Sequence, residues 1–303
     1  MTMSQILDEF IISRVMSGLV EKTVKDYREF CNIFVREVGV NYPYEELTQE
    51  HINRYIYHLM ERPVSKTTIA TYIRHFKIFL KWCHDNHPTE KFDYNKIKVP
   101  KSPKKNVFVY SEDDIRDIFS LIDADKEWIV MRNSAIVSLM LDSGLRQAEN
   151  TRILVRDVDF QRKVINVHGK GEKDRVVPLG NMSASYIKKY MSLCPAPFKI
   201  KDYLFVTRDM SQLTTNAVKL MVTKLAHKLP FDLSSHKLRH NFATNYCLDQ
   251  YEKYGQIDIY QLMYLLGHED VKTTSRYLHF AYEFIATKRS ISHVDNVFLA
   301  SAK

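Results

Sequence analysis

The chain has 303 residues, of which 45% are hydrophobic, so it is long enough for two domains with cores and too apolar for a disordered protein. Lysine and arginine number 44 against 36 acidic residues, and the net charge of +8 favours a polyanionic partner. The most apolar run, Ala135 to Leu141, is too short to cross a bilayer, and the four cysteines form no CxxC pair, so we expect a cytoplasmic protein with reduced thiols, no signal peptide and no membrane association.

Residues 1–90 are expected to form a small helical domain. Apolar residues recur there at three- and four-residue steps, which is the spacing of one face of an α-helix. The pattern predicts four helices, with apolar faces from Ile6 to Ile11, Val24 to Val38, Ile52 to Leu59 and Ile69 to Cys83. Thr48 is expected to cap the third helix.

The fourth predicted helix, from about Lys66 to His84, also carries a stripe of cations. Its members are Lys66, Arg74, Lys77 and Lys81. Charged helix faces are often no more than solvated surface. The second interpretation is that these cations contact the phosphates of DNA.

The helical periodicity stops after His87, and we assign residues 91–106 to a basic linker. Pro100 and Pro103 favour an extended chain in this segment. An extended segment rich in lysine suits a path beside a phosphate backbone, and the candidate contacts are Lys101, Lys104 and Lys105.

Residues 107–303 are expected to form a second domain that is mainly α with a small β-sheet, an α+β arrangement. Helices are predicted over Ser111 to Ile122, Val130 to Asp142 and Thr214 to Leu229. Strands are predicted at 163–167 and 175–179, which form a hairpin, and at 204–206. The glycine-rich hairpin turn fails the P-loop pattern, because Val164 and Gly171 stand where a glycine and a hydroxyl residue are needed, so we expect no ATP site.

The stretch from Ser234 to His279 concentrates residues with reactive side chains. Three helices are predicted there, over His236 to about Gln250, over Asp258 to Leu266, and from about Thr273 onward. His236 and Arg239 share one face of the first helix. Gly267 ends the second helix, so that His268 follows a turn, and Tyr277 lies early in the third. Such a cluster around helix ends suits an anion.

Four motifs occur in a fixed order along the chain. They are Gly144-Leu-Arg146-x-x-Glu149, Gly169-Lys170-Gly-x-Lys173-x-Arg175-x-Val-Pro-Leu179, His236-x-x-Arg239-His240, and Leu266-Gly267-His268 followed nine residues later by Tyr277. By these motifs the chain resembles the tyrosine recombinase (phage integrase) family over nearly its whole length. The resemblance implies a helical core-binding domain at 1–90 that binds DNA and a mixed α/β catalytic domain at 107–303. It also implies a site-specific DNA recombinase or integrase of a mobile element or replicon, which cleaves and rejoins strands through a 3′-phosphotyrosine intermediate.

Phosphodiester cleavage needs groups of the types that these motifs contain. Negative charge grows on the equatorial oxygens during attack, and two guanidiniums, assigned to Arg146 and Arg239, can clamp those oxygens. Tyr277 is expected to attack phosphorus, with nearby cations favouring its phenolate. His236 is assigned as the general base or proton partner, and His268 as a donor to a phosphate oxygen.

The leaving 5′ oxygen needs a proton. A lysine on the hairpin turn can supply it, and we assign Lys170 as the general acid, with Lys173 competing for the role. The phosphotyrosine linkage conserves the energy of the broken bond. Neither a metal ion nor ATP nor any other cofactor is therefore expected.

The resemblance also implies partners. We expect double-stranded DNA with specific recombination sites as the substrate and a homotetramer on paired sites. An accessory directionality protein is a possible further partner. In the family the carboxy-terminal segment docks on a neighbouring protomer. Its apolar residues here could do so or pack within the same chain, and they are Phe280, Tyr282, Phe284, Ile285, Ile291, Val294, Val297, Phe298 and Leu299.

Three other functions fit parts of the sequence. A zinc enzyme could use His236, His240 and His268, but Lys237 stands where a zincin has glutamate, and both arginines would be unexplained. A DNA-binding protein without catalysis is disfavoured because all six expected chemical groups are present. A type IB topoisomerase shares the chemistry, whereas the two-domain size and the spacing from the Leu-Gly-His motif to the tyrosine favour recombination.

The chain departs from the family pattern in three respects. Asn150 follows Glu149 where an aliphatic residue is usual, and the segment from Tyr246 to Asp258 is longer than in compact resolvases. No additional arm-binding domain is expected before the helical bundle. These departures favour a recombinase of a mobile element or plasmid, or a resolvase-like relative.

Overall fold

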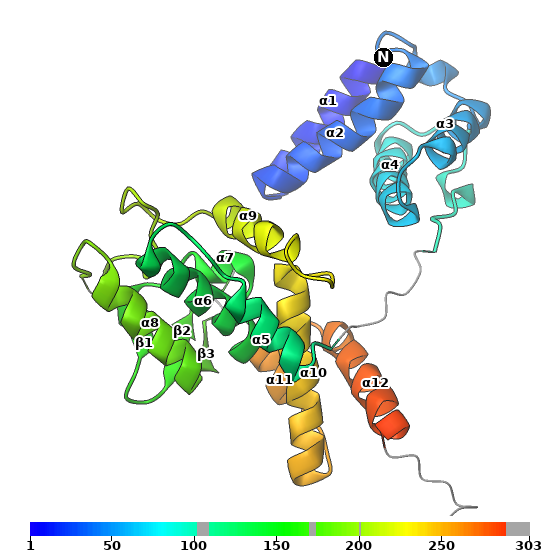
Figure 1. Ribbon diagram of the computed structural model, residues 1–303. Coiled ribbons are helices and arrows are strands. Elements are labelled where there is room, and N and C mark those ends of the chain that lie inside the picture. The colour runs from blue at the N-terminus through cyan, green and yellow to red at the C-terminus, as the bar shows by residue number, and fades with distance from the viewer. Residues whose placement is uncertain (102–108, 170–173, 200, 289–303) are drawn as a thin grey trace, which may run out of the picture. The chain divides into compact units, whose positions relative to one another are not determined.

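The computed structural model describes residues 1–101, 109–169, 174–199 and 201–288 (Figure 1). The chain divides into two compact units, at residues 1–105 and 106–303, and each unit has its own hydrophobic core. Within the described residues, no helix combines the length and the apolar character needed to cross a membrane. The two units are described separately.

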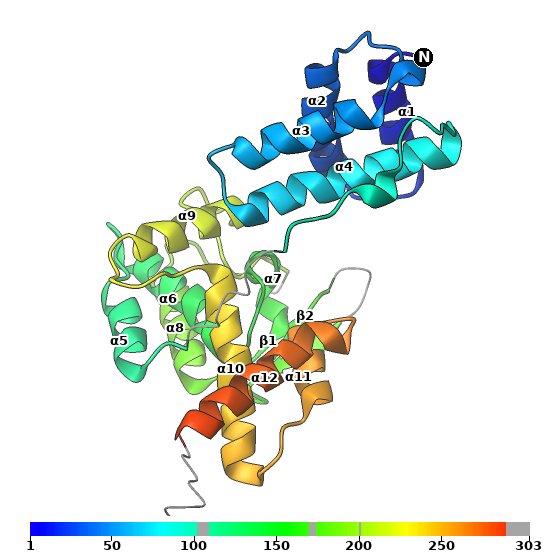
Figure 2. The same cartoon turned by 90° about the vertical axis from the view of Figure 1, so that its right-hand side faces the viewer.

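Within residues 1–101 the first unit is a bundle of four helices, as the apolar periodicity predicts. They are α1 (Met3–Met16), α2 (Glu21–Val38), α3 (Gln49–Glu61) and α4 (Lys66–Asn86), with short 3₁₀ turns η1 (Tyr44–Glu46) and η2 (Tyr94–Lys96). Thr48 is the N-cap residue that immediately precedes α3, as expected. Helices α1 and α2 lie side by side in Figure 1, and α3 lies beside α4 in Figure 2.

Aromatic side chains fill the core of the first unit. The Phe34 ring lies 5.1 Å from that of Tyr55 and 4.5 Å from that of Phe76, between ring centroids. Phe92 and Ile97, which follow α4, are buried in the same core. The extended conformation predicted for residues 91–106 is wrong at residues 94–96, which form the 3₁₀ turn η2, and the flanking Asp93 and Ile97 have extended backbones.

The second unit contains helices with a small sheet, as predicted. Its elements are α5 (Glu112–Ser120), α6 (Glu127–Asp142), α7 (Gln147–Asn150), η3 (Val155–Asp157), β1 (Val158–Asp159), β2 (Val164–Val167), β3 (Arg175–Pro178), α8 (Asn181–Leu193), α9 (Thr215–Ala226), α10 (Ser235–Tyr254), α11 (Ile259–Leu266) and α12 (Val271–Lys288). The strands form one antiparallel sheet in the order β1-β2-β3.

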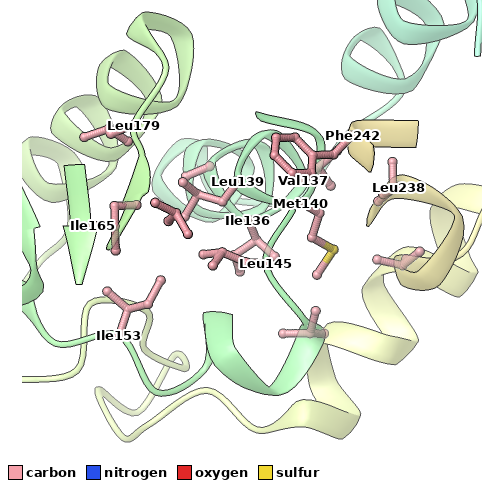
Figure 3. Packing of buried hydrophobic residues seen from close by; sticks show 14 of the residues in the cluster. Ile136, Val137, Leu139, Met140, Leu145, Ile153, Ile165, Leu179, Leu238 and Phe242 are labelled. Atoms are coloured by element: carbon pink, nitrogen blue, oxygen red, sulfur yellow. The ribbon is translucent and has the colours of Figure 1, made fainter. Parts of the chain in front are cut away.

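Helix α6 is the centre of the second unit. It is buried on most sides, and it packs against α8 and α10. Figure 3 shows its residues Ile136, Leu139 and Met140 among side chains from the sheet and from α10. The sheet contributes Ile165 and α10 contributes Phe242. Packing around α6 thus brings the hairpin and α10 into one folded unit.

Three of the differences from the predicted elements have a clear physical reason. Residues 204–206 are buried but do not form a strand. Val206 makes only an isolated bridge with Gln212, and the preceding Tyr203 makes one with Leu154. Helix α8 was not predicted, since its sequence is mostly polar and few of its residues are buried. Helix α10 continues four residues beyond Gln250, to Tyr254, through polar residues that carry no apolar periodicity.

Candidate active site

The turn between α6 and α7 places the first motif. Gly144 has a φ of +62°, and a Cβ there would lie 2.3 Å from the Phe242 ring, so the turn requires glycine. Arg146 is the N-cap residue of the short helix α7, and its backbone N–H donates to Oε2 of Glu149 at 2.6 Å. Glu149 is buried. The arginine and the glutamate of this motif are therefore in direct contact with each other.

Glu149 is bound by two guanidiniums. Arg146 donates through Nη1 to Oε1 at 2.8 Å, and Arg175 donates to both carboxylate oxygens at 2.9 and 2.8 Å. Burial alone raises the pKa of Glu149, but the hydrogen bonds and charge of Arg175, followed by those of Arg146, lower it to about 2. Glu149 is thus ionised at neutral pH and balances the charge of these arginines.

Arg239 completes this group of cations from α10. It is buried, its Nη1 donates to the carbonyl O of Gly144 at 2.7 Å, and Nη1 lies 3.8 Å from Oε2 of Glu149. Burial and the charge of Arg146 lower the pKa of Arg239 to about 10, against the opposing effect of Glu149. The guanidinium remains charged at neutral pH.

The carboxyl end of α11 binds all three arginines. Arg175 Nε donates to the carbonyl of Leu265 at 2.8 Å, Arg239 Nη2 donates to that of Leu266, and Arg146 Nη2 donates to that of Gly267 at 2.8 Å. Gly267 has a φ of +58°, and a Cβ on it would lie 3.0 Å from Nη1 of Arg175. The helix end that meets the arginines is thus its negative, carbonyl end, and the attraction for an anion comes from the guanidiniums.

His268 follows this turn directly, as predicted. Its Nδ1 lies 2.8 Å from Oγ1 of Thr274, a buried residue of α12. Burial and the charges of Arg239 and Arg146 lower the pKa of His268 to about 4. His268 is therefore neutral at neutral pH and retains one N–H for donation.

Tyr277 lies in the second turn of α12 and is 1% exposed. In the described part of the chain, its hydroxyl is in hydrogen-bond contact with Nδ1 of His240 and with Nη2 of Arg276, the latter at 3.1 Å. His236 is exposed, and its ring centroid lies 3.9 Å from that of His240. The histidine in contact with the tyrosine is therefore His240, and the predicted proton partner His236 packs against His240.

Lys170 and Lys173 lie outside the described residues. The strands on either side of their turn are described, and Val167 pairs with Arg175 across the hairpin. Arg175, the first residue of β3, forms an ion pair with Glu149, so this end of the hairpin lies at the site. This is the turn to which the general acid was assigned.

The residues predicted to contact DNA differ in their surroundings. Lys66, Arg74, Lys81 and Lys101 are exposed. Lys77 is half-buried, and its Nζ donates to the carbonyl O of Ile97 at 3.0 Å. Lys104 and Lys105 lie outside the described residues. Lys77 therefore binds the segment after α4, and the exposed part of the stripe is Lys66, Arg74 and Lys81.

Four residues of the site have no role in the recombination chemistry predicted from the sequence. Glu149, Arg175 and His240 stood inside the quoted motifs, so their positions carried a signal that was not used. Arg276 belonged to no motif, and its contact with Tyr277 depends on a side-chain conformation that spacing does not reveal. Within the described residues, no group of three or more His, Cys, Asp or Glu side chains is arranged to hold a metal ion.

Two family models match most of the chain. The model described as Phage integrase family matches residues 109–283, and that of the phage integrase N-terminal SAM-like domain matches residues 6–90. Tyrosine recombinase XerC of Listeria innocua is 28% identical over 282 residues, which cover 89% of this chain and 88% of that protein. XerC of Bacillus subtilis is 26% identical over 267 residues, which cover 86% and 85%.

Solved structures of similar fold cover nearly the whole chain. An integrase of the transposon Tn1549, in complex with a circular intermediate DNA, has a TM-score of 0.73 at 19% identity and covers 91% of this chain and 95% of its own. The XerA recombinase has a TM-score of 0.52 at 26% identity and covers 95% and 99%. The arrangement of helices and sheet in this chain is thus similar to theirs.

Proposed function

The chain belongs to the phage integrase family, and from that premise we propose which of its residues carry out each step of site-specific DNA recombination. It is a tyrosine-type DNA strand transferase that cleaves and rejoins strands through a 3′-phosphotyrosine intermediate. Recombination is favoured over nicking and closing by a type IB topoisomerase, since the relatives are named recombinases. We infer double-stranded DNA with specific sites as its substrate.

One observation supports the assignment of the site most strongly. Arg146 and Arg239 come from different motifs, yet their guanidiniums bind the consecutive carbonyls of Gly267 and Leu266, next to His268. A guanidinium has five N–H donors, and each of these arginines uses some of them on the protein. Arg146 is exposed, so its remaining donors face the solvent from which a phosphodiester would arrive.

In the proposed step the phenolic oxygen of Tyr277 attacks phosphorus. Arg146 and Arg239 stabilise the charge that grows on the non-bridging oxygens. His268 donates to one of them through Nε2, and in this tautomer its Nδ1 accepts a hydrogen bond from the Thr274 hydroxyl, 2.8 Å away. His236 is proposed as the proton partner of the tyrosine, either directly or by way of His240, whose ring lies next to it. Burial and the charges of Arg276 and Arg239 lower the pKa of His236, so it is neutral and able to accept.

The bond from phosphorus to the 5′ oxygen breaks as the new bond forms. Lys170 is proposed to protonate this leaving oxygen, and Lys173 is the alternative. The 5′ hydroxyl produced can attack the phosphotyrosine of another strand. This reverse reaction restores a phosphodiester and the free tyrosine, so the chemistry balances without a cofactor.

We assign DNA binding outside the site to the first unit and the segment after it. Residues 1–90 would be the core-binding domain, residues 91–106 the connection and residues 107–303 the catalytic domain. The exposed cations Lys66, Arg74 and Lys81 of α4, together with Lys101, would contact phosphates. We further propose a homotetramer on paired sites, with an accessory protein setting direction.

Replacement of Tyr277 by phenylalanine tests the proposed chemistry. Tyr277→Phe removes only the hydroxyl, so DNA binding should persist while the covalent adduct on a nicked suicide substrate disappears from denaturing gels. Tyr282→Phe is the matched control, because Tyr282 is exposed on the same helix. A normal adduct from the Tyr277 variant would refute the assignment of the nucleophile.

A further inference from the structure

Arg276 immediately precedes Tyr277, and its guanidinium lies at the phenolic oxygen. Nη2 donates to that oxygen at 3.1 Å, and Cζ lies 4.9 Å from the centre of the Tyr277 ring. A guanidinium has no acceptor atom, so the oxygen accepts this hydrogen bond. Arg276 is an exposed residue, whereas Tyr277 is buried.

Several other groups face this oxygen or its cation. Helix α10 contributes Arg239, His240 and Cys247, with His236 behind His240, and His268 is close enough to Arg276 to have its pKa lowered. Burial raises the pKa of Tyr277, and the charge of Arg276 and then its hydrogen bond are the largest opposing effects, ahead of Arg239. Burial and the charges of His236 and Arg276 lower the pKa of His240 to about 3, so His240 is a neutral neighbour.

The contacts of Tyr277 differ in how they respond to movement. A side chain that is 1% exposed must shift before its oxygen meets a phosphodiester. His240 belongs to α10, so displacement of α12 separates it from the tyrosine. Arg276 belongs to the same helix and is the adjacent residue. Arg276 Nη2 also lies 2.8 and 2.6 Å from the two ring nitrogens of His240, so a displacement of α12 would release this contact while the contact with the adjacent tyrosine can persist.

We propose that Arg276 is a catalytic residue, whose guanidinium donates to the Tyr277 oxygen and stabilises the negative charge that this oxygen gains as it loses its proton. This role rests on Tyr277 being the nucleophile. In the step, the phenolic proton passes to a neutral imidazole of the site, and the oxygen forms its bond to phosphorus. The bond to the 5′ oxygen breaks, and that oxygen takes a proton from the general acid.

The first test needs no DNA and no recombination activity. The full chain carries 3-fluorotyrosine at position 277, and its ¹⁹F chemical shift is followed against pH in the parent and in the Arg276→Gln, Arg276→Lys and Lys272→Gln variants. Lys272 is the matched control, since it lies one turn earlier on the same helix. The phenol should titrate at higher pH in Arg276→Gln, at an intermediate pH in Arg276→Lys, and as in the parent in Lys272→Gln.

The second test measures adduct formation on the suicide substrate against pH. At neutral pH the rate should fall by on the order of 100-fold in Arg276→Gln, recover in part in Arg276→Lys, and stay normal in Lys272→Gln. Equal titration of the phenol in all four proteins would overturn the proposal, and so would an upward shift shared by Lys272→Gln. A parent that forms no adduct on any DNA would overturn the proposed function and with it the catalytic role, while the titration would still decide whether Arg276 stabilises the Tyr277 phenolate.

Discussion

Glu149 holds a negative charge in a buried position because arginines surround it. The carboxylate accepts from Arg146 and from both terminal nitrogens of Arg175, and Arg239 lies nearby. Unpaired, a buried charge of this kind would be strongly unfavourable. The folded state therefore stabilises the ionised form, and the stability of the protein should depend on it.

This dependence has a definite sign. The pKa of Glu149 is about 2 in the folded protein against an ordinary 4.5. Its contribution to the free energy of unfolding is therefore complete at pH values above 4.5 and is lost as the pH falls towards 2. Glu149→Gln should lower the free energy of unfolding by about 3 kcal/mol at pH 7, with the gap narrowing below pH ~4. Urea unfolding at several pH values measures this, and Glu112→Gln, at an exposed site, is the control. A gap that stays constant down to pH ~3 would contradict the electrostatic explanation.

The two assigned clamp residues should respond differently to removal. Arg146→Ala removes partly exposed donors, so adduct formation should slow by on the order of 100-fold, and folding stability should fall less than in Arg239→Ala because Arg175 still pairs with Glu149. Arg239→Ala should show the same defect and also destabilise the fold by a few kcal/mol, because it leaves the buried carbonyls of Gly144 and Leu266 without their donor. Adduct kinetics and urea unfolding on both variants test the distinction. Equal stability of the two would contradict the assigned burial.

At the scale of elements, helix α4 combines core packing with an exposed set of cations. Replacing Lys66, Arg74 and Lys81 together by alanine should weaken DNA binding and flatten its salt dependence, by up to about 0.9 in the logarithmic slope for each phosphate that is no longer neutralised. Lys77→Ala should leave the slope nearly unchanged, because its amine is bonded to Ile97. Binding measured across a range of salt concentrations separates the two. An unchanged slope for the triple variant would mean that this face points to water.

Elements with strong apolar periodicity were predictable from the sequence, and those held by tertiary contacts were not. Helix α4 and helix α6 each carry enough apolar residues to mark their inner faces. The run at 204–206 signalled burial, which strands and irregular core segments share. The network of Glu149 with Arg175 joins positions 26 residues apart, and the motif spacing gave no distance between their side chains.

At the scale of the whole molecule, the proposed assembly on paired sites depends on contacts between chains. Residues 289–303 lie outside the described part, and their apolar side chains include Ile291, Val294, Val297, Phe298 and Leu299. A chain ending at Lys288 should form the adduct on a single site normally while losing paired-site complexes by about tenfold or more. Gel-shift and sedimentation measurements test this. A variant with a glycine-serine tail of equal length controls for chain length, and normal pairing by the truncated chain would refute docking.

The end of helix α11 has a consequence for how the protein could be controlled. Three successive main-chain carbonyls, from Leu265 to Gly267, anchor three cations that come from three separate parts of the chain. A displacement of this one helix end would misplace all three charges together, so the site would fail as a unit. Whatever moves α11, whether a neighbouring protomer or the DNA itself, would act as an on-off control over cleavage.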